Sequence, residues 1–247
     1  MQLLGGKTSG FTGLMLVFGT AQADIFQGEA FEGAEEASWE AEIEYGLVVT
    51  TGNTETENTN GGLEVVRERA QWRQRTTARA LRAVDEDTIV AERYSFSYKL
   101  DYRFRERDYG FATARYEDDR FSGYDYRLSE AVGYGRRAVA GPRVRLDLEV
   151  GVGMSHESPE GEDREDNGMA RLAGDLRWQL QEHSRFRQAL LVEEAGSTYV
   201  ESETSLSSQV VEDLAMRASL QVRYHSDVPE GVEKTDTITS FNLVYSM

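Results

Sequence analysis

The chain has 247 residues, of which 29% are charged and 39% hydrophobic, and its formal net charge is −17. The absence of cysteine excludes a disulfide scaffold and metal centres held by thiolates. The acidic balance argues against a nucleic-acid-binding protein, because neutralising phosphates requires a positive surface. Beyond residue 23 no apolar run reaches the ~20 residues that span a bilayer as a helix. A membrane β-barrel stays possible, because its alternating strands average to a hydrophilic composition.

The N-terminal segment differs from the rest of the chain. Residues 1–23 contain no acid and one base, Lys7, and they end in a small-x-small motif at Ala23. This pattern predicts a signal peptide cleaved between Ala23 and Asp24, rather than a buried first helix. Residues 24–37 are acidic and contain little that could be buried, so we expect a flexible periplasmic lead-in there.

From Trp39 onward the dominant pattern is the alternation of apolar and polar residues, which is the period of a strand and not of a helix. In residues 144–154, for example, apolar residues occupy every second position, and Arg145, Asp147 and Glu149 lie between them. The same signal predicts twelve strands in all, near residues 39–51, 54–67, 71–84, 91–104, 109–117, 127–138, 143–155, 168–180, 185–197, 200–211, 213–225 and 236–247. We therefore expect an all-β chain that folds, over residues 38–247, into an up-and-down antiparallel transmembrane barrel of about twelve strands.

The connections between these strands alternate in length. Tight turns are expected at 105–108, 139–142 and 181–184, and longer polar loops at 85–90, 118–126, 157–167 and 227–235. Short periplasmic turns and longer outer loops are typical of bacterial outer-membrane barrels, whereas a soluble sandwich has no reason to alternate in this way.

Strand length and aromatic placement indicate which face contacts lipid. Strands of twelve to fourteen residues exceed the usual length in globular sheets, and they suffice to cross a bilayer when tilted. Aromatic residues are expected in two interfacial belts. The belt at the short turns comprises Trp39, Phe104, Tyr109, Trp178, Phe186 and Tyr245, and the belt at the long loops Tyr94, Tyr116, Tyr126 and Tyr199. A secreted soluble ligand-binding barrel, with its apolar face inside, is the alternative.

If apolar side chains face lipid, the charged series of each strand faces the lumen. The lumen charges predicted in this way are Glu40, Glu42, Glu44, Arg73, Arg75, Arg143, Arg145, Asp147 and Glu149. Arginine suits a confined lumen because its planar guanidinium binds carboxylates through two parallel hydrogen bonds. Such pairs could plug the barrel or line a narrow polar channel, and the sequence leaves both open.

Three stretches resemble the YdiY-like family of salt-induced outer-membrane proteins. They are residues 52–56 (GNTET), 116–137 (YEDDRFSGYDYRLSEAVGYGRR) and 234–245 (KTDTITSFNLVY). The resemblance covers most of the chain beyond the signal peptide. It implies a monomeric bacterial outer-membrane β-barrel of undefined role, sometimes linked to salt or osmotic stress, and it supplies no catalytic residue.

The C-terminal stripe is a candidate signal for the barrel-assembly machinery. Its alternating residues are Phe241, Leu243, Tyr245 and Met247. Barrels of this kind usually end in Phe, so the alternation is intact here while the terminal aromatic residue is missing. Outer-membrane lipid and the assembly machinery are the expected partners of a monomer.

Candidate chemistry is sparse. His156 and His225 are expected at the outer rim, near Ser158 and Ser226, so a Ser–His–acid triad of an outer-membrane hydrolase is the alternative to a non-enzymatic barrel. His183 lies on a short turn, and no Gly-x-Ser-x-Gly, P-loop or HExxH motif is present.

The outer loops are rich in acids, especially residues 157–166. Carboxylates can bind calcium or magnesium, but the loops lack EF-hand spacing, and a solvated acidic rim is the preferred interpretation. We therefore expect no cofactor or metal. The negative rim would attract cations, so a pore would be weakly cation-preferring.

Overall fold

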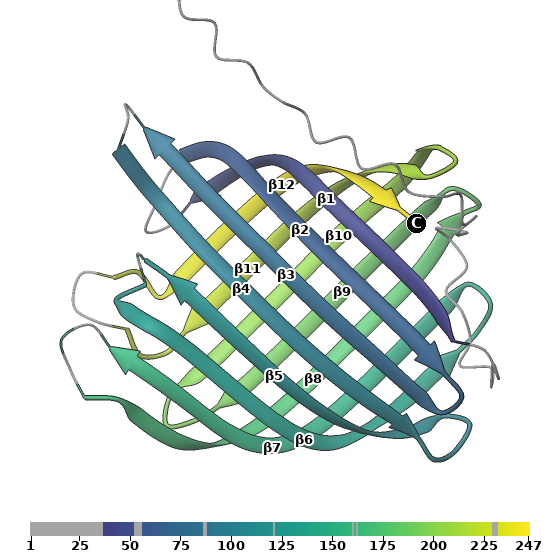
Figure 1. Cartoon of the computed structure of the whole chain (residues 1–247), viewed down its shortest axis with the longest axis horizontal. Helices are drawn as coiled ribbons and strands as arrows, with labels where there is room; N and C mark the ends of the chain where they lie inside the picture. The colour runs from purple at the N-terminus through teal and green to yellow at the C-terminus, as the bar shows by residue number, and fades with distance from the viewer. Residues whose placement is uncertain are drawn as a thin grey trace, which may run out of the picture.

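In the computed structural model the described residues are 37–51, 56–85, 88–120, 122–159, 161, 163–228 and 232–247. They form one closed barrel of tilted strands (Figure 1). Its strands are β1 (Ser38–Thr51), β2 (Thr56–Arg69), β3 (Trp72–Asp85), β4 (Thr88–Arg103), β5 (Asp108–Asp119), β6 (Tyr124–Ala140), β7 (Val144–Pro159), β8 (Glu165–Gln181), β9 (Ser184–Glu194), β10 (Thr198–Val211), β11 (Leu214–His225) and β12 (Thr235–Ser246). Within these ranges, no helix is long and apolar enough to cross a membrane. The expected signal peptide and nearly all of the expected lead-in lie outside the described residues.

Each strand pairs antiparallel with its neighbours in the chain, and β1 pairs with β12 to close the barrel. The closing seam places Tyr45 opposite Leu243. Past the end of β12, the backbone N–H and C=O of Met247 bond to Ala41, both at 2.9 Å. Closure leaves the sheet without an unpaired edge, as a barrel in lipid requires.

The twelve-strand antiparallel barrel confirms the predicted fold class. Strand ends differ from the predicted ones by up to four residues, as where β7 continues to Pro159. The loop expected at 85–90 is much shorter than predicted, because Asp85 at the end of β3 pairs with Thr88 at the start of β4. Backbone N–H and C=O groups need hydrogen-bond partners, so two strands can stay paired beyond the point where their apolar and polar side chains stop alternating.

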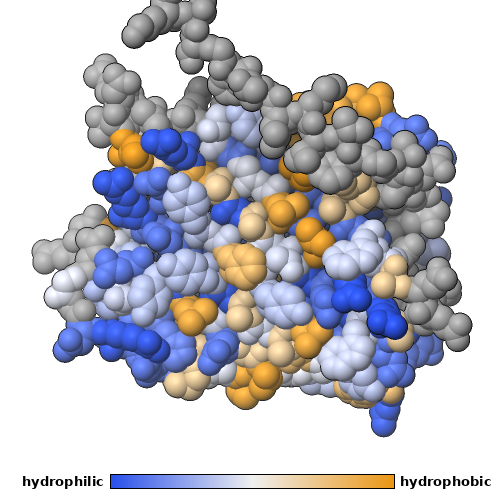
Figure 2. Space-filling view, in the orientation of Figure 1, coloured by the Kyte–Doolittle hydropathy of each residue, from blue (hydrophilic) through white to orange (hydrophobic). Residues whose placement is uncertain are grey.

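The distribution of polar residues is inverted relative to a soluble protein. On the outside, Val152 and Leu172 are 65% and 56% exposed, whereas Asp101 and Arg223, on the inside, are each 2% exposed. The face seen in Figure 2 carries hydrophobic side chains across its middle and hydrophilic ones toward its ends. The structure therefore contradicts the soluble alternative with an apolar core, and the apolar stripes form the lipid face.

Exposed aromatic side chains lie near both ends of the lipid face, and a few, such as Phe96 and Phe241, lie at the middle of their strands. Those near the short turns include Trp39, Trp72, Phe104, Trp178 and Tyr245, and those near the outer loops Tyr94, Tyr116 and Tyr224. Two of the aromatic residues assigned to the belts from the sequence, Tyr109 and Tyr199, are instead buried and turned into the lumen.

Glycine explains the inward position of Tyr109. This residue lies opposite Gly135 on β6, and a Cβ on that glycine would lie 2.2 Å from the tyrosine ring. Gly133 makes room for Phe111 in the same way, since its Cβ would lie 2.6 Å from that ring. The two rings therefore fill part of the lumen beside β6.

Candidate functional site in the charged lumen

The pairing register places the inward-pointing polar residues of neighbouring strands side by side, and together these residues form the inner face of the barrel. A cavity of about 350 Å³ occupies the lumen, and its lining contains nine carboxylates and nine basic side chains. A second cavity of about 120 Å³, called the inner chamber here, lies toward the chain termini and the short turns. The two cavities share lining residues, among them Glu44, Arg75 and Arg187.

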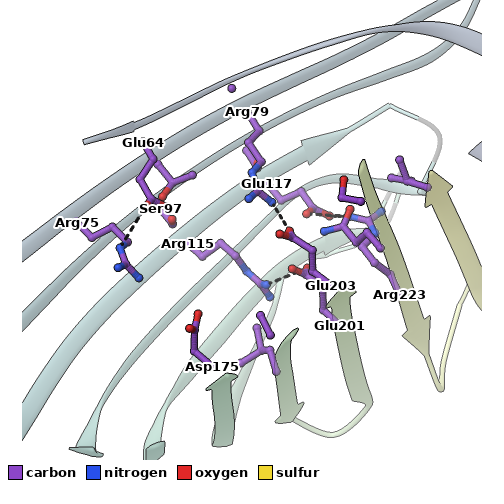
Figure 3. A pocket seen from close by; sticks show the side chains of 18 of the residues that line it. Glu64, Arg75, Arg79, Ser97, Arg115, Glu117, Asp175, Glu201, Glu203 and Arg223 are labelled. Atoms are coloured by element: carbon purple, nitrogen blue, oxygen red, sulfur yellow. Dashed lines mark hydrogen bonds and ion pairs between the residues drawn. The ribbon is translucent and has the colours of Figure 1, made fainter. Parts of the chain in front are cut away.

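Several ion pairs join strands that are not neighbours and so cross the lumen (Figure 3). Arg79 on β3 donates to Glu203 on β10 at 3.0 Å. Arg115 on β5 reaches Glu193 on β9 at 2.8 Å. These side chains subdivide the interior, so any continuous path through it is narrow.

A buried cluster of ion pairs lies in the outer half of the lumen. Arg223 on β11 donates to Glu117 at 3.1 Å and to Asp119 at 3.2 Å, both on β5 (Figure 3 shows Arg223 with Glu117). Arg127 on β6 donates to the same Glu117 at 2.8 Å. Buried charge-assisted hydrogen bonds of this kind hold the facing walls together.

A second cluster surrounds Glu149, one of the predicted lumen residues. Its carboxylate pairs with Lys99 on β4 and accepts a hydrogen bond from Arg171 at 2.9 Å. The Tyr109 hydroxyl donates to Glu149 at 2.9 Å as well. Lys99 also lies 5.3 Å from the Phe111 ring centre, within cation–π range.

The structure places eight of the nine predicted lumen charges on the inner face. Arg73 pairs with Asp101 at 2.7 Å, and Asp147 accepts from Arg137 at 3.0 Å. The predicted residues that line the inner chamber are Glu40, Glu42, Glu44, Arg73, Arg75 and Arg145. Arg143 was wrongly assigned to the lumen: it is exposed in the turn before β7, where the strand alternation no longer applies.

The prediction missed the partners of these charges. Glu42 pairs with Arg217 at 2.9 Å, and Glu44 pairs with the same guanidinium. Arg75 lies 3.5 Å from Glu64. Extending the inward series along the expected strands 54–67 and 213–225 would have found Glu64 and Arg217, but not which charge meets which across the lumen.

The rim triad is not assembled. His156 lies on the outer face, with its Nδ1 2.6 Å from Asp166 and 2.8 Å from Arg164. His225 faces inward, opposite Tyr199, and contacts Arg127 at 3.0 Å. The barrel wall separates the two imidazoles, because successive residues of a strand point to opposite faces, and His156 belongs to the outward series of β7 while His225 belongs to the inward series of β11.

The serines proposed for the triad have other partners. Ser158 contacts Asp125 at 3.4 Å, and the Ser226 hydroxyl accepts from the Thr198 N–H at 2.7 Å. His183, in the turn after β8, contacts Gln209 at 2.9 Å. The residues that the structure describes contain no group of three His, Cys, Asp or Glu placed to hold a metal ion.

The C-terminal stripe occupies the lipid face of β12. Phe241, Leu243 and Tyr245 are exposed there, while the intervening Asn242 and Val244 are buried on the inside. Met247 follows the strand and is half-buried.

Comparison with solved structures identifies the same architecture. The NanC porin aligns with a TM-score of 0.56 and 9% identity over 82% of this chain and 98% of that one. The KdgM porin aligns with a TM-score of 0.50 and 10% identity over 83% of this chain and 99% of that one. The translocator domain of the autotransporter NalP from Neisseria meningitidis gives 0.51 and 9% over 84% and 88%. The fold is that of outer-membrane barrels.

Sequence comparison gives the family. The chain is 26% identical over 215 residues to the uncharacterized protein YdiY of Escherichia coli (strain K12), covering 85% of this chain and 83% of that protein. The resemblance drawn from the three sequence stretches is thereby confirmed. The model of the family described as "Protein of unknown function, DUF481" matches residues 43–247. The chain therefore belongs to the DUF481 family.

Proposed function

We propose that this protein is a monomeric, non-enzymatic barrel of the bacterial outer membrane whose lumen conducts ions and small polar solutes through a narrow path. The observation that carries the proposal is the adjoining pair of cavities of about 350 and 120 Å³, both lined by charged side chains. A barrel that served only as an envelope scaffold would have no need to keep this space polar and unfilled.

The likeness to barrels named porins supports conduction by analogy of fold. The width of the path depends on the cross-lumen pairs, above all Arg79–Glu203 and Arg223–Glu117. Conduction is therefore small and sensitive to single substitutions in these pairs. The exported chain reaches the membrane through the assembly machinery, which reads the stripe on β12, and outer-membrane lipid surrounds the finished barrel.

The outer mouth sets a weak preference for cations. In the sequence, the segments that join the strands at this end carry nine acids and three bases. The resulting negative field concentrates cations where solutes enter. A role in salt or osmotic stress follows as part of this proposal, since a narrow ion path in the outer membrane affects the ionic balance of the periplasm.

Single-channel recording in planar bilayers tests this function. The refolded protein is expected to give small currents in KCl, with a reversal potential in a salt gradient that shows a modest potassium preference. Arg79→Gln removes the Arg79–Glu203 pair and is expected to raise the conductance. Arg120→Gln is the control, because Arg120 is exposed and pairs with Glu92 on the outer face.

Two results would contradict the proposal. Anion-selective currents would refute the cation preference. The absence of current from both the wild type and Arg79→Gln would instead favour a structural envelope protein with a plugged lumen.

A further inference from the structure

Exposed arginines gather along one side of the rim at the short-turn end of the barrel. They are Arg69 at the end of β2, Arg105 and Arg107 between β4 and β5, Arg136 on β6 and Arg143 before β7. Farther around the same rim, residues 182–183 and 212–213 form the turns after β8 and β10, and they include three acids and no arginine or lysine. The rim of this acidic protein is therefore basic over β2 to β7, and these five arginines are called the basic arc here.

Backbone hydrogen bonds place the turns of the basic arc side by side. The Arg103 N–H donates to the Gln71 carbonyl at 2.8 Å, which joins the turn after β2 to the end of β4 (Figure 1). The Arg137 N–H donates to the Arg107 carbonyl at 2.8 Å, which joins the turn after β4 to β6. The arginines of the arc therefore belong to one continuous surface and are not isolated charges.

Most of these guanidiniums have no acidic partner. Within the part of the chain that the structure describes, the four arginines of the arc other than Arg136 make no ion pair. Arg136 donates to the buried Asp108 at 3.2 Å. The remaining acid of these turns, Glu106, is exposed. Five arginines against two acids leave an excess of three positive charges on this surface.

The basic arc lies where the lipid face of the barrel ends. Arg69 is directly opposite Trp72 in the strand ladder, and directly opposed residues share a face, here the lipid face on which Trp72 is exposed. At the other end of the arc, the Arg143 carbonyl accepts from the Gln179 N–H at 2.8 Å, next to the exposed Trp178. Tryptophan concentrates at the interface between membrane and water. The arginines are therefore at the depth of the lipid headgroups.

We propose that the basic arc binds the headgroups of anionic phospholipids, such as phosphatidylglycerol, in the leaflet at the short-turn end. A guanidinium forms paired hydrogen bonds with phosphate oxygens, and its long side chain follows apolar surface to reach the headgroups. Each base close to an anionic membrane surface strengthens binding about fivefold. Anionic lipid is then enriched beside β2 to β7 relative to the acidic turns after β8 and β10.

This inference rests on the membrane location of the barrel and not on the proposed conduction. Failure of the channel recordings and failure of lipid binding are thus separate results. Residues 24–36, which precede β1 at the same end, are acidic in sequence and are the competing partner of the arc. Lipid is favoured because the arc adjoins exposed tryptophans of the lipid face, where headgroups surround the barrel.

Brominated lipids test the proposal with the protein's own tryptophans as probes. The chain has three tryptophans, Trp39, Trp72 and Trp178, and all three are exposed near the short turns. Bromine on an acyl chain quenches the fluorescence of a tryptophan that the lipid contacts. In vesicles of phosphatidylcholine containing the refolded protein, brominated phosphatidylglycerol is expected to bind beside these tryptophans about fivefold more tightly than brominated phosphatidylcholine.

The double variant Arg69→Gln, Arg143→Gln removes the arginines beside Trp72 and Trp178. It is expected to bring the ratio of the two lipid affinities close to one. The double variant Arg82→Gln, Arg120→Gln is the matched control, because both of its arginines are exposed at the outer end of the barrel. The control makes the same change in net charge and is expected to keep the preference.

Heat-modifiable gel mobility confirms that each variant is folded, and the double variant Arg105→Gln, Arg107→Gln, in an exposed turn, replaces the first pair if it fails this check. Equal quenching of the wild type by the two lipids would overturn the proposal and leave residues 24–36 as the partner of the arc. An equal loss of preference in the control would overturn it too, because the lipid would then respond to the overall charge and not to the basic arc.

Discussion

In the outer half of the lumen Arg223 meets carboxylates across the barrel, whereas in the inner chamber three arginines lie opposite one another on β7, β8 and β9. Arg223 in the outer half contacts two carboxylates of β5 and is 2% exposed. Arg145 in the inner chamber has another arginine, Arg177, as its direct neighbour on β8. Arginine thus has different direct neighbours at the two ends of the lumen.

The difference shows that arginine can have two roles in a polar lumen. A guanidinium that is enclosed by carboxylates stabilises the closed barrel and leaves little capacity for a ligand. Arginines placed directly opposite one another repel, and the carboxylate of Asp175, shared by Arg177 and Arg187, offsets part of that repulsion. Substitutions should therefore have opposite signs in the two halves.

The largest effect is expected from Arg223→Leu. Without Arg223, within the described part of the chain, Glu117 keeps only Arg127 and Asp119 keeps only Arg93 as a basic partner, so the loss in the free energy of unfolding is expected to be up to about 3–5 kcal/mol. Urea unfolding in phospholipid vesicles measures it. Arg120→Leu, at the same end but on the outer surface, is expected to leave stability almost unchanged, and an equal loss in both variants would show that the outer pairs are not special.

Both halves of the lumen are expected to lie behind the same lipid-facing surface of the barrel. The substitution Val152→Arg tests this. Val152 lies at the middle of β7 and is 65% exposed, and an arginine at the bilayer midplane costs about 2–4 kcal/mol. Val139→Arg, near the short turn after β6, should cost only about 0–1 kcal/mol because it lies near the interface. Similar unfolding free energies for the two variants would contradict the assigned membrane position.

A smaller effect of opposite sign is expected from Arg145→Gln. Relieving repulsion between directly opposed charges should stabilise the barrel by about 0.2–1 kcal/mol in phosphate-free buffer. If urea unfolding in phosphate-free buffer showed that Arg145→Gln lowers the stability of the barrel, Arg145 would be a stabilising residue, as Arg223 is expected to be.

The smallest expected effect is the dependence of these stability differences on salt concentration. Raising KCl from about 0.05 M to about 0.5 M shortens the screening length severalfold, which should narrow the stability difference between Arg145→Gln and the wild type. The difference for Arg223→Leu should change little, because buried pairs are screened less. Unfolding series at the two salt concentrations check this, and an equal salt response in the two variants would remove the distinction between the halves.

Much of the fold could be predicted from the chain because lipid imposes a strict period of two. The strand at 143–155 was recognised from its valines and leucines, and the register then placed Arg145, Asp147 and Glu149 on the inside. The predicted side-chain directions were wrong at positions where the two-residue alternation of a strand does not decide them. Arg143 precedes its strand, and Tyr109 turned inward because Gly135, on another strand, leaves room for its ring.

The sequence by itself determined the barrel, its strands and which face of most strands is polar, since these depend on local alternation and on turns between neighbours in the chain. Only the tertiary structure decided that Arg79 meets Glu203, that His156 and His225 are separated by the wall, and that Arg145, Arg177 and Arg187 form a row. Those relations depend on barrel closure and on the relative register of many strands. The excess of acid seen in the composition therefore gave no sign of the arginine row inside.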